Sequence, residues 1–587
     1  MEIKIYYDLI YAGTFLETVY SQGMLKDSEN NEVFRLVEEE ITAHYPTDPA
    51  VQQPSSKRLR ANADNILSVA NLQPIENAGG FQIHLLGNEI HFPALQLALE
   101  YTKGNFTLRD IPEPKPIVSK ITLQHPLQMF KEVHRNQIKA YQRLFQVKKA
   151  DTDMSRLIGH PQMLNEAFVP ERFQLVSFLQ VPELLRDFTP SFYAVELDLK
   201  NYFPQIPIQH GLSQYLGVIM GNKHYVQTVL TQGWSGSTFV AQALTYAFVA
   251  LCTVRYKNLP NITELLSNGL PSHILLPGFL LIIVYDNILI VTDSPKSTND
   301  WATAIQETAQ HLNLVIKYMR VTHNRTQYLG QEYKMTDGKT YWRTLPSRLQ
   351  KWTNPQESVT LREALGYISI VIRENQIRSR SLKNVSHVVK WLASLSLLTS
   401  SDNWRNLIVT EQFDAIVRPS LLLLDDSWTH ISMFVPVNPL FIATDATPST
   451  LAWYTRVGGK DTVFSCSTEG HSHINFLEAL AVYVAIEANY VNHDAIFILC
   501  DNQAASLAYV KGYSSNGEIT RLVQESKSGD VPIIMFDVES EGNIADFPSR
   551  NKEIPENHST RKKWDSFVEA ASILKITHSK WMHRSTW

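Results

Sequence analysis

The chain has 587 residues, a net charge of −5 and three cysteines. A chain of this length exceeds one hydrophobic core, so we expect about three to five domains or subdomains. A hydrophobic content of 44% and a charged content of 19% are typical of a folded globular protein. The few cysteines exclude a disulfide framework and indicate a reducing compartment, cytoplasmic and/or nuclear. No apolar run has the length of a membrane span, and the first residues show no signal-peptide pattern.

The first 130 residues contain no motif with an assignable chemistry. We expect an N-terminal extension over residues 1–50, a Pro-, Gln- and Ser-rich linker over 51–65, and a folded region of unknown role over 66–130. The short basic run KRLR at residues 57–60 fits a phosphate-contacting or nuclear-import patch, but a solvated loop is the favoured interpretation.

A basic hairpin is predicted next. Residues 145–151 (FQVKKAD) and 156–158 (RLI) are two short strands joined by a polar turn, which would aim Lys149 and Arg156 at one place. Two long cations on adjacent strands suit a triphosphate, because phosphate oxygens need hydrogen-bond donors and positive charge together. On its own, this segment fits a basic surface hairpin better.

Aspartates follow two predicted strands further along the chain. Asp198 ends the alternating run in VELDLKNYFPQIP (195–207), and Asp286 lies between two apolar runs in LLIIVYDNILIVTD (280–293). A buried carboxylate is costly unless it is neutralised, and a metal ion is the commonest remedy. An Asp-Asn turn without any chemistry fits residues 285–287 equally well.

A glycine-bearing loop, LTQGWSGS at residues 230–237, opens a predicted helix (238–254) between these two aspartates. Glycine at a helix start allows the backbone to approach a ligand closely. The loop contains Gln232 and Gly233 and is a weak signal by itself.

The order and spacing of these elements resemble a retroelement reverse transcriptase of the gypsy-like or DIRS-like kind. The basic hairpin is similar to the fingers motif, LDLKNYFPQIP to the first palm motif, LTQGWSGS to LPQGxxxSP, and VYDN to YxDD. The residues similar to the later palm motifs and to the connection segment are 313–317, QYLGQE (327–332) and LREALGY (361–367).

The resemblance implies a role for each matched residue. Asp198 and Asp286, with the main chain of Leu199, would hold two Mg²⁺ ions, or Mn²⁺, for in-line displacement. The residues implied to bind the incoming dNTP are Lys149 and Arg156 at the phosphates, the Leu199 amide, Phe203 as a steric gate, and Gln232 and Gly233.

One position departs from the motif, because Asn287 replaces the second aspartate of YxDD. An amide oxygen can coordinate a cation but brings no charge to it. We expect a reduced or retuned polymerase, and a dead polymerase stays open.

Four more carboxylates lie on separate predicted elements after residue 438. Asp445 and Asp501 end strands, Glu478 lies on an amphipathic helix, and Asp546 begins a helix in NIADFPSR (543–550). Their order resembles the ribonuclease H domain of retroelements, whose closing motif is NxxADxxSR. The resemblance implies that Asp445, Glu478, Asp501 and Asp546 ligate two Mg²⁺ ions that activate water.

The expected fold class is an α+β and α/β multidomain chain, a right-hand polymerase followed by a ribonuclease H-like α/β domain. The expected boundaries are fingers and palm at 131–335, thumb and connection at 336–435, ribonuclease H at 436–552, and a basic tail at 553–587. The basic and tryptophan residues of the tail suit contact with phosphates and stacking on bases, or equally a helix packed on the domain.

The expected function is an RNA- and DNA-dependent DNA polymerase with ribonuclease H activity on RNA/DNA hybrids, serving retrotransposon replication. Its partners would be template RNA, primer, DNA, RNA/DNA hybrid and dNTPs, with no membrane and an open oligomeric state. The alternative is a domesticated scaffold that binds RNA or hybrids with weak or lost polymerase activity, which Asn287 favours.

Overall fold

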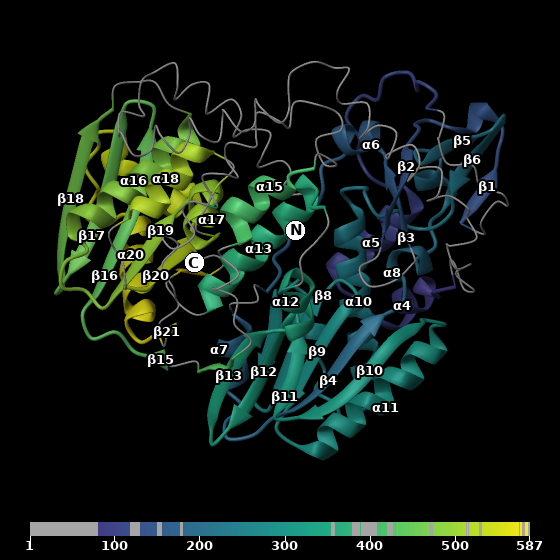
Figure 1. Cartoon of the computed structure of the whole chain (residues 1–587), viewed down its shortest axis with the longest axis horizontal. Helices are drawn as coiled ribbons and strands as arrows, with labels where there is room; N and C mark the ends of the chain where they lie inside the picture. The colour runs from purple at the N-terminus through teal and green to yellow at the C-terminus, as the bar shows by residue number, and fades with distance from the viewer. Residues whose placement is uncertain are drawn as a thin grey trace. The chain divides into compact units, whose positions relative to one another are not determined.

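The computed structural model describes most of the chain from Gly80 onward, and its elements are shown in Figure 1. The described residues up to Thr340 belong to one compact unit, here the first unit, and those from Tyr341 onward belong to the second unit. The described ranges are 80–117, 129–148, 155–176, 180–353, 358–377, 388, 408–418, 427–430, 433–468, 473–511, 514, 516–526, 531–574, 576–577 and 581–584.

A five-stranded antiparallel sheet forms the centre of the first unit, with the strand order β10-β4-β9-β8-β7. The two apolar runs around residues 285–287 are β8 and β9, which confirms the predicted pair of buried strands. The strands are β4 (Tyr193–Leu199), β7 (His273–Leu276), β8 (Phe279–Val284), β9 (Asn287–Thr292) and β10 (Ile316–His323).

Two long helices, α10 (Ser237–Arg255) and α11 (Pro295–His311), share the apolar core of this sheet. Side chains of β4 that alternate with Asp198, such as Leu197 and Leu199, are buried in the same core because neighbouring residues of a strand point to opposite faces. Asp198 therefore lies on the other face. Helix α10 is long and apolar enough to cross a bilayer, but most of its residues are buried within the unit, as in the core helix of a folded protein.

The same core includes residues from the region of unknown role. Phe81, Leu86 and Leu95 pack with the sheet and with α10, so this region is part of the first unit. The two helices there are α4 (Ile83–Glu89) and α5 (Pro93–Lys103). The described helices of the region expected at 66–130 therefore contribute to the core of the first unit.

The predicted basic hairpin is confirmed as β2 (Arg143–Lys148) and β3 (Ser155–His160), paired antiparallel. A small sheet with the order β1-β6-β5 lies in the same unit. The remaining elements of the first unit are β1 (Phe130–Glu132), η2 (Arg135–Gln137), α6 (Gln162–Ala167), α7 (Val181–Arg186), α8 (Tyr202–Gln205), α9 (His210–Ser213), β5 (Gly217–Met220), β6 (Lys223–Gln227), η3 (Thr263–Leu266), β11 (Arg325–Tyr328) and β12 (Gln331–Thr336).

The second unit contains a six-stranded mixed sheet with the order β18-β17-β16-β19-β20-β22. The first three strands are antiparallel, whereas β16, β19, β20 and β22 run parallel. The strands are β16 (Pro439–Thr447), β17 (Thr450–Val457), β18 (Lys460–Ser467), β19 (Ala495–Cys500), β20 (Ile533–Asp537) and β22 (Trp581–Arg584).

Helices cover both faces of this sheet, which gives an α/β layered unit (Figure 1). One core lies under α16 (Ile474–Asn489), α17 (Gln503–Lys511) and α18 (Gly517–Glu525), and another lies under α20 (Ser559–Ser572). The expected α+β and α/β multidomain class is thereby confirmed.

The remaining elements from β13 onward are short or lie before the mixed sheet. They are β13 (Lys339–Thr344), α12 (Pro346–Thr353), α13 (Leu361–Ile377), α15 (Thr410–Gln412), η7 (Phe413–Val417), β14 (Thr429–His430), β15 (Met433–Phe434), η9 (Ser540–Gly542), α19 (Asp546–Ser549) and β21 (Ile576–Thr577).

The basic tail is part of the second unit. Helix α20 buries Trp564 and Phe567 against the sheet, and β22 pairs with β20, so the sheet extends past residue 552. Trp564 is 1% exposed and cannot stack on a base. Helix α20 therefore matches the second expectation for the tail, a helix packed on the domain. Trp587 lies outside the described residues, and the side chain of Trp581 is not described.

Candidate active sites

The register of the central sheet places Asp198 between two side chains on neighbouring strands. Asp198 pairs with Asn287 on β9 and with Tyr318 on β10. Directly opposed residues of adjacent strands point to the same face. Tyr318 is 44% exposed, so this face of the sheet is accessible beside the carboxylate. The tyrosine was not anticipated, because pairing between β4 and β10 has no signature within either strand.

Asp286 lies in the tight turn between β8 and β9. Tyr285 adopts a left-handed conformation with φ of 55°, which lets two residues reverse the chain. The amide of Leu199 donates to the carbonyl oxygen of Asp286 at 2.9 Å, and this bond holds Asp286 beside the end of β4. The Leu199 amide, which the sequence predicts to face a triphosphate, donates to the turn in this structure.

Helix α10 fixes the turn from the buried side. The side chain of Gln242 donates to the carbonyl of Ile283 at 2.8 Å and accepts from the amide of Tyr285 at 2.8 Å. Thr245 donates to the carbonyl of Tyr285 at 2.7 Å. Both side chains are fully buried, so water does not compete for the hydrogen bonds that hold the turn. Helix α10, which follows the glycine loop, thus holds the turn that carries Asp286.

Asn287 makes a direct contact with the carboxylate next to it. Its Nδ2 donates to Oδ1 of Asp286 at 3.2 Å, and its carbonyl accepts from the hydroxyl of Tyr328 at 3.1 Å. An aspartate at this position would replace the donor by a second negative charge. Asparagine therefore lowers the charge density of the cluster, and it orients Asp286 in the absence of a cation.

Lys317 supplies a positive charge to the same cluster. Its Nζ lies 2.8 Å from Oδ2 of Asp198, whose side chain is 12% exposed against 59% for the lysine. The lysine also lies 5.8 Å from the ring centre of Tyr318. The sequence placed residue 317 in a motif that closes the palm but did not assign it to Asp198.

The other residues predicted to bind the nucleotide lie on α8, on the basic hairpin and in the loop before α10. Phe203, on α8, has its ring centre 6.5 Å from that of Tyr285. Arg156 lies on β3, but its side chain is outside the described part, as is Lys149 altogether. Gln232 and Gly233 lie in the loop before α10, where Gly233 has φ of 139°.

Asn165 anchors that loop. Its Nδ2 donates to the carbonyl of Gly233 at 2.8 Å and its Oδ1 accepts from the amide of Ser235 at 2.8 Å. A Cβ at Gly233 would lie 2.0 Å from the carbonyl oxygen of Gly159 on β3, so only glycine fits. The loop and the basic hairpin are therefore in direct contact. The sequence alone assigned no role to Asn165.

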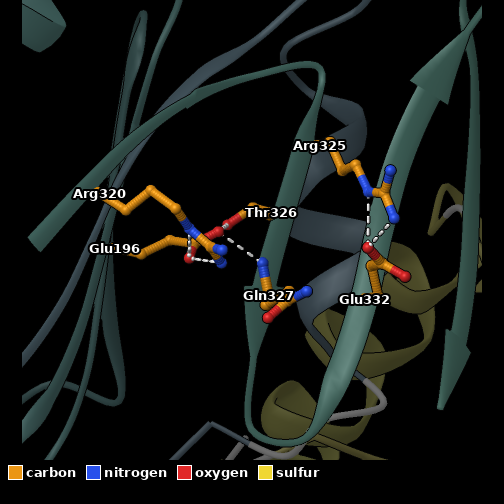
Figure 2. A network of polar contacts seen from close by, with 6 residues as sticks. All are labelled: Glu196, Arg320, Arg325, Thr326, Gln327 and Glu332. Atoms are coloured by element: carbon orange, nitrogen blue, oxygen red, sulfur yellow. Dashed lines mark hydrogen bonds and ion pairs between the residues drawn. The ribbon is translucent and has the colours of Figure 1, made fainter. Parts of the chain in front are cut away.

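A buried polar network lies on the face of the sheet that carries Asp198, two residues earlier on β4 (Figure 2). Glu196 is 2% exposed and accepts from Arg320 Nε at 2.8 Å, from Thr326 Oγ1 at 2.8 Å and from the amide of Gln327 at 2.6 Å. The network joins β4, β10 and β11, and it supports the register of β10 against β4 that places Tyr318 opposite Asp198. A second ion pair in Figure 2 joins Arg325 to the buried Glu332.

The second site is built at the ends of parallel strands in the second unit. Thr444 on β16 pairs with Cys500 on β19, so Asp445 and Asp501, which follow them, are level at the same sheet edge. Asn543 donates to the carbonyl of Thr444 at 2.8 Å and thereby holds the segment before Asp546 against β16. Asp546 begins α19 and accepts from Arg550 Nε at 2.8 Å.

The electrostatics of these carboxylates show that they lie close together. Burial, and then the neighbouring Asp501 and Asp546, raise the pKa of Asp445 to about 6. Burial, and then Asp445 and Asp501, raise the pKa of Glu478 to about 9. Burial is also the largest cause of the raised pKa of Asp501. Burial disfavours the ionised form of each carboxylate, and the nearby like charges add to that effect.

This arrangement fits a divalent cation. Glu478 is 5% exposed, and its Oε2 has no hydrogen-bond partner among the described residues. A ligand oxygen of Glu478 and one of Asp501 lie within 4.8 Å of each other. A buried carboxylate oxygen without a donor is costly, and a hard cation with oxygen ligands removes that cost. The four expected carboxylates therefore converge from β16, α16, β19 and α19.

Comparison with known proteins gives matches only among solved structures. No family model and no curated protein matches the chain. The foamy viral protease-reverse transcriptase in complex with RNA/DNA hybrid matches at 14% identity with a TM-score of 0.40, over 89% of this chain and 64% of that chain. The same viral protein with dsDNA matches at 14% and 0.36, over 86% and 96%. A variant labelled dRH with dsDNA gives 14% and 0.36, over 86% and 81%.

Proposed function

We propose that the chain is a reverse transcriptase with a fused ribonuclease H, acting in the replication of a retrotransposon. It would extend a primer on RNA or DNA templates in its first unit and cleave the RNA strand of RNA/DNA hybrids in its second. The observation that carries this proposal is the convergence of Asp445, Glu478, Asp501 and Asp546, with the partnerless buried oxygen of Glu478 inside the cluster.

In the second unit, the four carboxylates would hold two Mg²⁺ ions, or Mn²⁺. Bound Mg²⁺ supplies a water of lowered pKa and neutralises charge on the leaving oxygen. Asp445 and Asp501 are held level by the parallel pairing of β16 and β19, and Glu478 enters from the helix above them. Arg550, at the edge of this cluster, restrains Asp546.

In the first unit, Asp198 and Asp286 would hold Mg²⁺ beside the primer end. Gln242 and Thr245 keep the turn that carries Asp286 rigid, so the carboxylate is positioned before any substrate binds. Phe203 is proposed as the plate that excludes a ribose 2′-hydroxyl, and Gln232 and Gly233 as contacts to the nucleotide. Lys149 and Arg156 are proposed as contacts to the triphosphate of the dNTP.

Cleavage of a labelled RNA/DNA hybrid in Mg²⁺ tests the nuclease. Asp501→Asn removes one negative charge from the cluster, so we expect cleavage to fall at least about a hundredfold, as when a metal site is broken. Asp565→Asn is the matched control, because Asp565 lies in α20, is 60% exposed, pairs with Arg456 and is not one of the four carboxylates. Undiminished cleavage by Asp501→Asn would show that these carboxylates are not the site.

Primer extension on an RNA template tests the polymerase. Asp198→Ala removes the carboxylate that β4 places between Asn287 and Tyr318, and we expect extension to vanish. Asp300→Ala on α11 is the control, since Asp300 makes only a 3.7 Å surface pair with Lys296. Equal extension by wild type and Asp198→Ala would remove the polymerase from the proposal.

A second candidate function is a scaffold that binds RNA or hybrids and polymerises little. Two observations favour it: Asn287 brings no charge to the first cluster, and Lys317 already neutralises Asp198. Tight hybrid binding without extension in either Mg²⁺ or Mn²⁺ would support this alternative.

A further inference from the structure

A thiol lies inside the carboxylate cluster of the second unit. Cys500 is the last residue of β19 and directly precedes Asp501. Its Sγ and one carboxylate oxygen each of Glu478 and Asp501 all lie within 4.8 Å of one another. The thiol is buried and donates a long hydrogen bond of 3.7 Å to the carbonyl of Asn502.

The thiol is accompanied by an oxygen that lacks a partner. Glu478 is 5% exposed, and its Oε2 accepts no hydrogen bond from the described residues. A buried acceptor left in this state is destabilising, and more so when it is charged. The local structure therefore favours a cation at the point where the sulfur and the two carboxylates meet.

The ligand types determine which cations these three groups would prefer. Mg²⁺ binds oxygen ligands and has no use for sulfur, whereas Zn²⁺ and Cd²⁺ bind thiolate together with carboxylate. With a Zn–S distance of about 2.3 Å and Zn–O of about 2.1 Å, tetrahedral coordination separates sulfur from oxygen by roughly 3.6 Å. Side-chain movements of about 1 Å would bring the three ligand atoms to that spacing.

We propose that Glu478, Cys500 and Asp501 form a binding site for thiophilic divalent cations of the Zn²⁺ and Cd²⁺ class. On binding, the Cys500 thiol releases its proton to solvent and the sulfur lone pair forms the bond to the metal. The site shares two carboxylates with the Mg²⁺ cluster, so a thiophilic ion and Mg²⁺ compete. The expected inhibition of cleavage by a thiophilic ion depends on the proposed nuclease function. Binding of the ion does not depend on it.

The chain offers matched controls, because it has three cysteines in different surroundings. Cys466 is exposed on the edge strand β18, and Cys252 is buried in α10 of the first unit. Cys466→Ser thus removes the most accessible thiol and leaves the carboxylate cluster untouched.

Titration of the full-length, metal-free protein with Cd²⁺ tests the binding without nucleic acid. Sulfur-to-cadmium charge transfer gives an ultraviolet absorption that carboxylates cannot produce. We expect saturable absorption in wild type and in Cys466→Ser, and its loss in Cys500→Ser. Persistence in Cys500→Ser, loss in Cys466→Ser, or no absorption in wild type would each overturn the proposal.

A second variant guards against misfolding of Cys500→Ser. Glu478→Gln keeps the thiol and the side-chain shape but removes one charged ligand, so we expect the charge-transfer band with Cd²⁺ affinity lowered at least about tenfold. Circular dichroism of each variant shows whether the fold is kept. Unchanged Cd²⁺ affinity in a folded Glu478→Gln would also contradict the site.

Cleavage assays separate this proposal from the proposed function. At fixed Mg²⁺, added Cd²⁺ is expected to inhibit wild type and Cys466→Ser more strongly than Cys500→Ser, each relative to its own uninhibited rate. Cd²⁺ binding through Cys500 in a protein that does not cleave hybrids would contradict the nuclease activity and support the metal site. Cleavage in Mg²⁺ without the charge-transfer band would support the nuclease activity and contradict the metal site.

Discussion

The ammonium group of Lys317 lies 2.8 Å from Oδ2 of Asp198. Lys317 is on β10, the edge strand of the sheet, which pairs with β4. A cation bound by Asp198 must compete with this lysine. The ion pair has one largely exposed partner, so it stabilises the fold by no more than about 1 kcal/mol. A substitution of Lys317 can therefore change metal binding at Asp198 while changing the stability of the fold very little.

Lys317→Met is expected to tighten Mg²⁺ binding at the first site about two- to fivefold, because it removes the competing charge without opening a cavity. The apparent Mg²⁺ constant from primer extension measures this change. Lys296→Met on α11 is the control, since Lys296 is 86% exposed and belongs to a surface pair. Weaker Mg²⁺ binding in Lys317→Met would show that the lysine assists the cation instead of competing with it.

Asn287→Asp is expected to increase the rate of nucleotide addition, because the cluster gains a charged metal ligand. Without Mg²⁺ the same change places a carboxylate where Nδ2 donated to Asp286, so the melting temperature should fall in a chelator and recover with Mg²⁺. Single-turnover extension and thermal unfolding measure the two effects. An unchanged extension rate would mean that Asn287 does not limit polymerisation.

Glu196→Ala is expected to destabilise the first unit by about 2–4 kcal/mol. It removes the shared acceptor of Arg320, Thr326 and the Gln327 amide, and so leaves the buried Thr326 hydroxyl and the Gln327 amide without this acceptor. Chemical denaturation measures the loss. Glu132→Ala is the control, because its pair with Lys223 is exposed on both sides, and its cost should stay under about 1 kcal/mol. Equal costs for the two variants would rule out a structural role for the network.

The second unit should lose stability as the pH rises when no metal is present. Asp445 and Glu478 have ordinary pKa values of 3.8 and 4.5, raised in the folded protein to about 6 and about 9. Between these values the folded state binds more protons than the unfolded state, so stability is full at low pH and declines as pH rises through the folded pKa values.

Denaturation of the metal-free protein from pH 4 to pH 9 measures that decline. Glu478→Gln is uncharged at every pH, so its slope should be shallower than that of wild type, especially in the upper half of the range. Parallel slopes for both proteins would mean that Glu478 does not titrate in this way. Added Mg²⁺ should stabilise wild type more at high pH, where the carboxylates are ionised.

The sequence alone determined which carboxylates end which strands. Apolar runs define β8, β9, β16 and β19, because a strand buried on both faces needs continuous aliphatic residues. Asp501 directly follows its run, whereas Asp286 and Asp445 each come one residue later. The helix that carries Glu478 was likewise readable from its own periodicity. These features are local, so short stretches of chain suffice to specify them.

Only the tertiary structure decided what surrounds those carboxylates. The positions of Lys317 and Tyr318 beside Asp198 depend on the register of β10 against β4, which is held by Glu196 and its partners. The meeting of Cys500 with Glu478 depends on how α16 packs on the sheet. Register and helix packing are sums of many weak contacts between distant segments, so no single stretch of sequence encodes them.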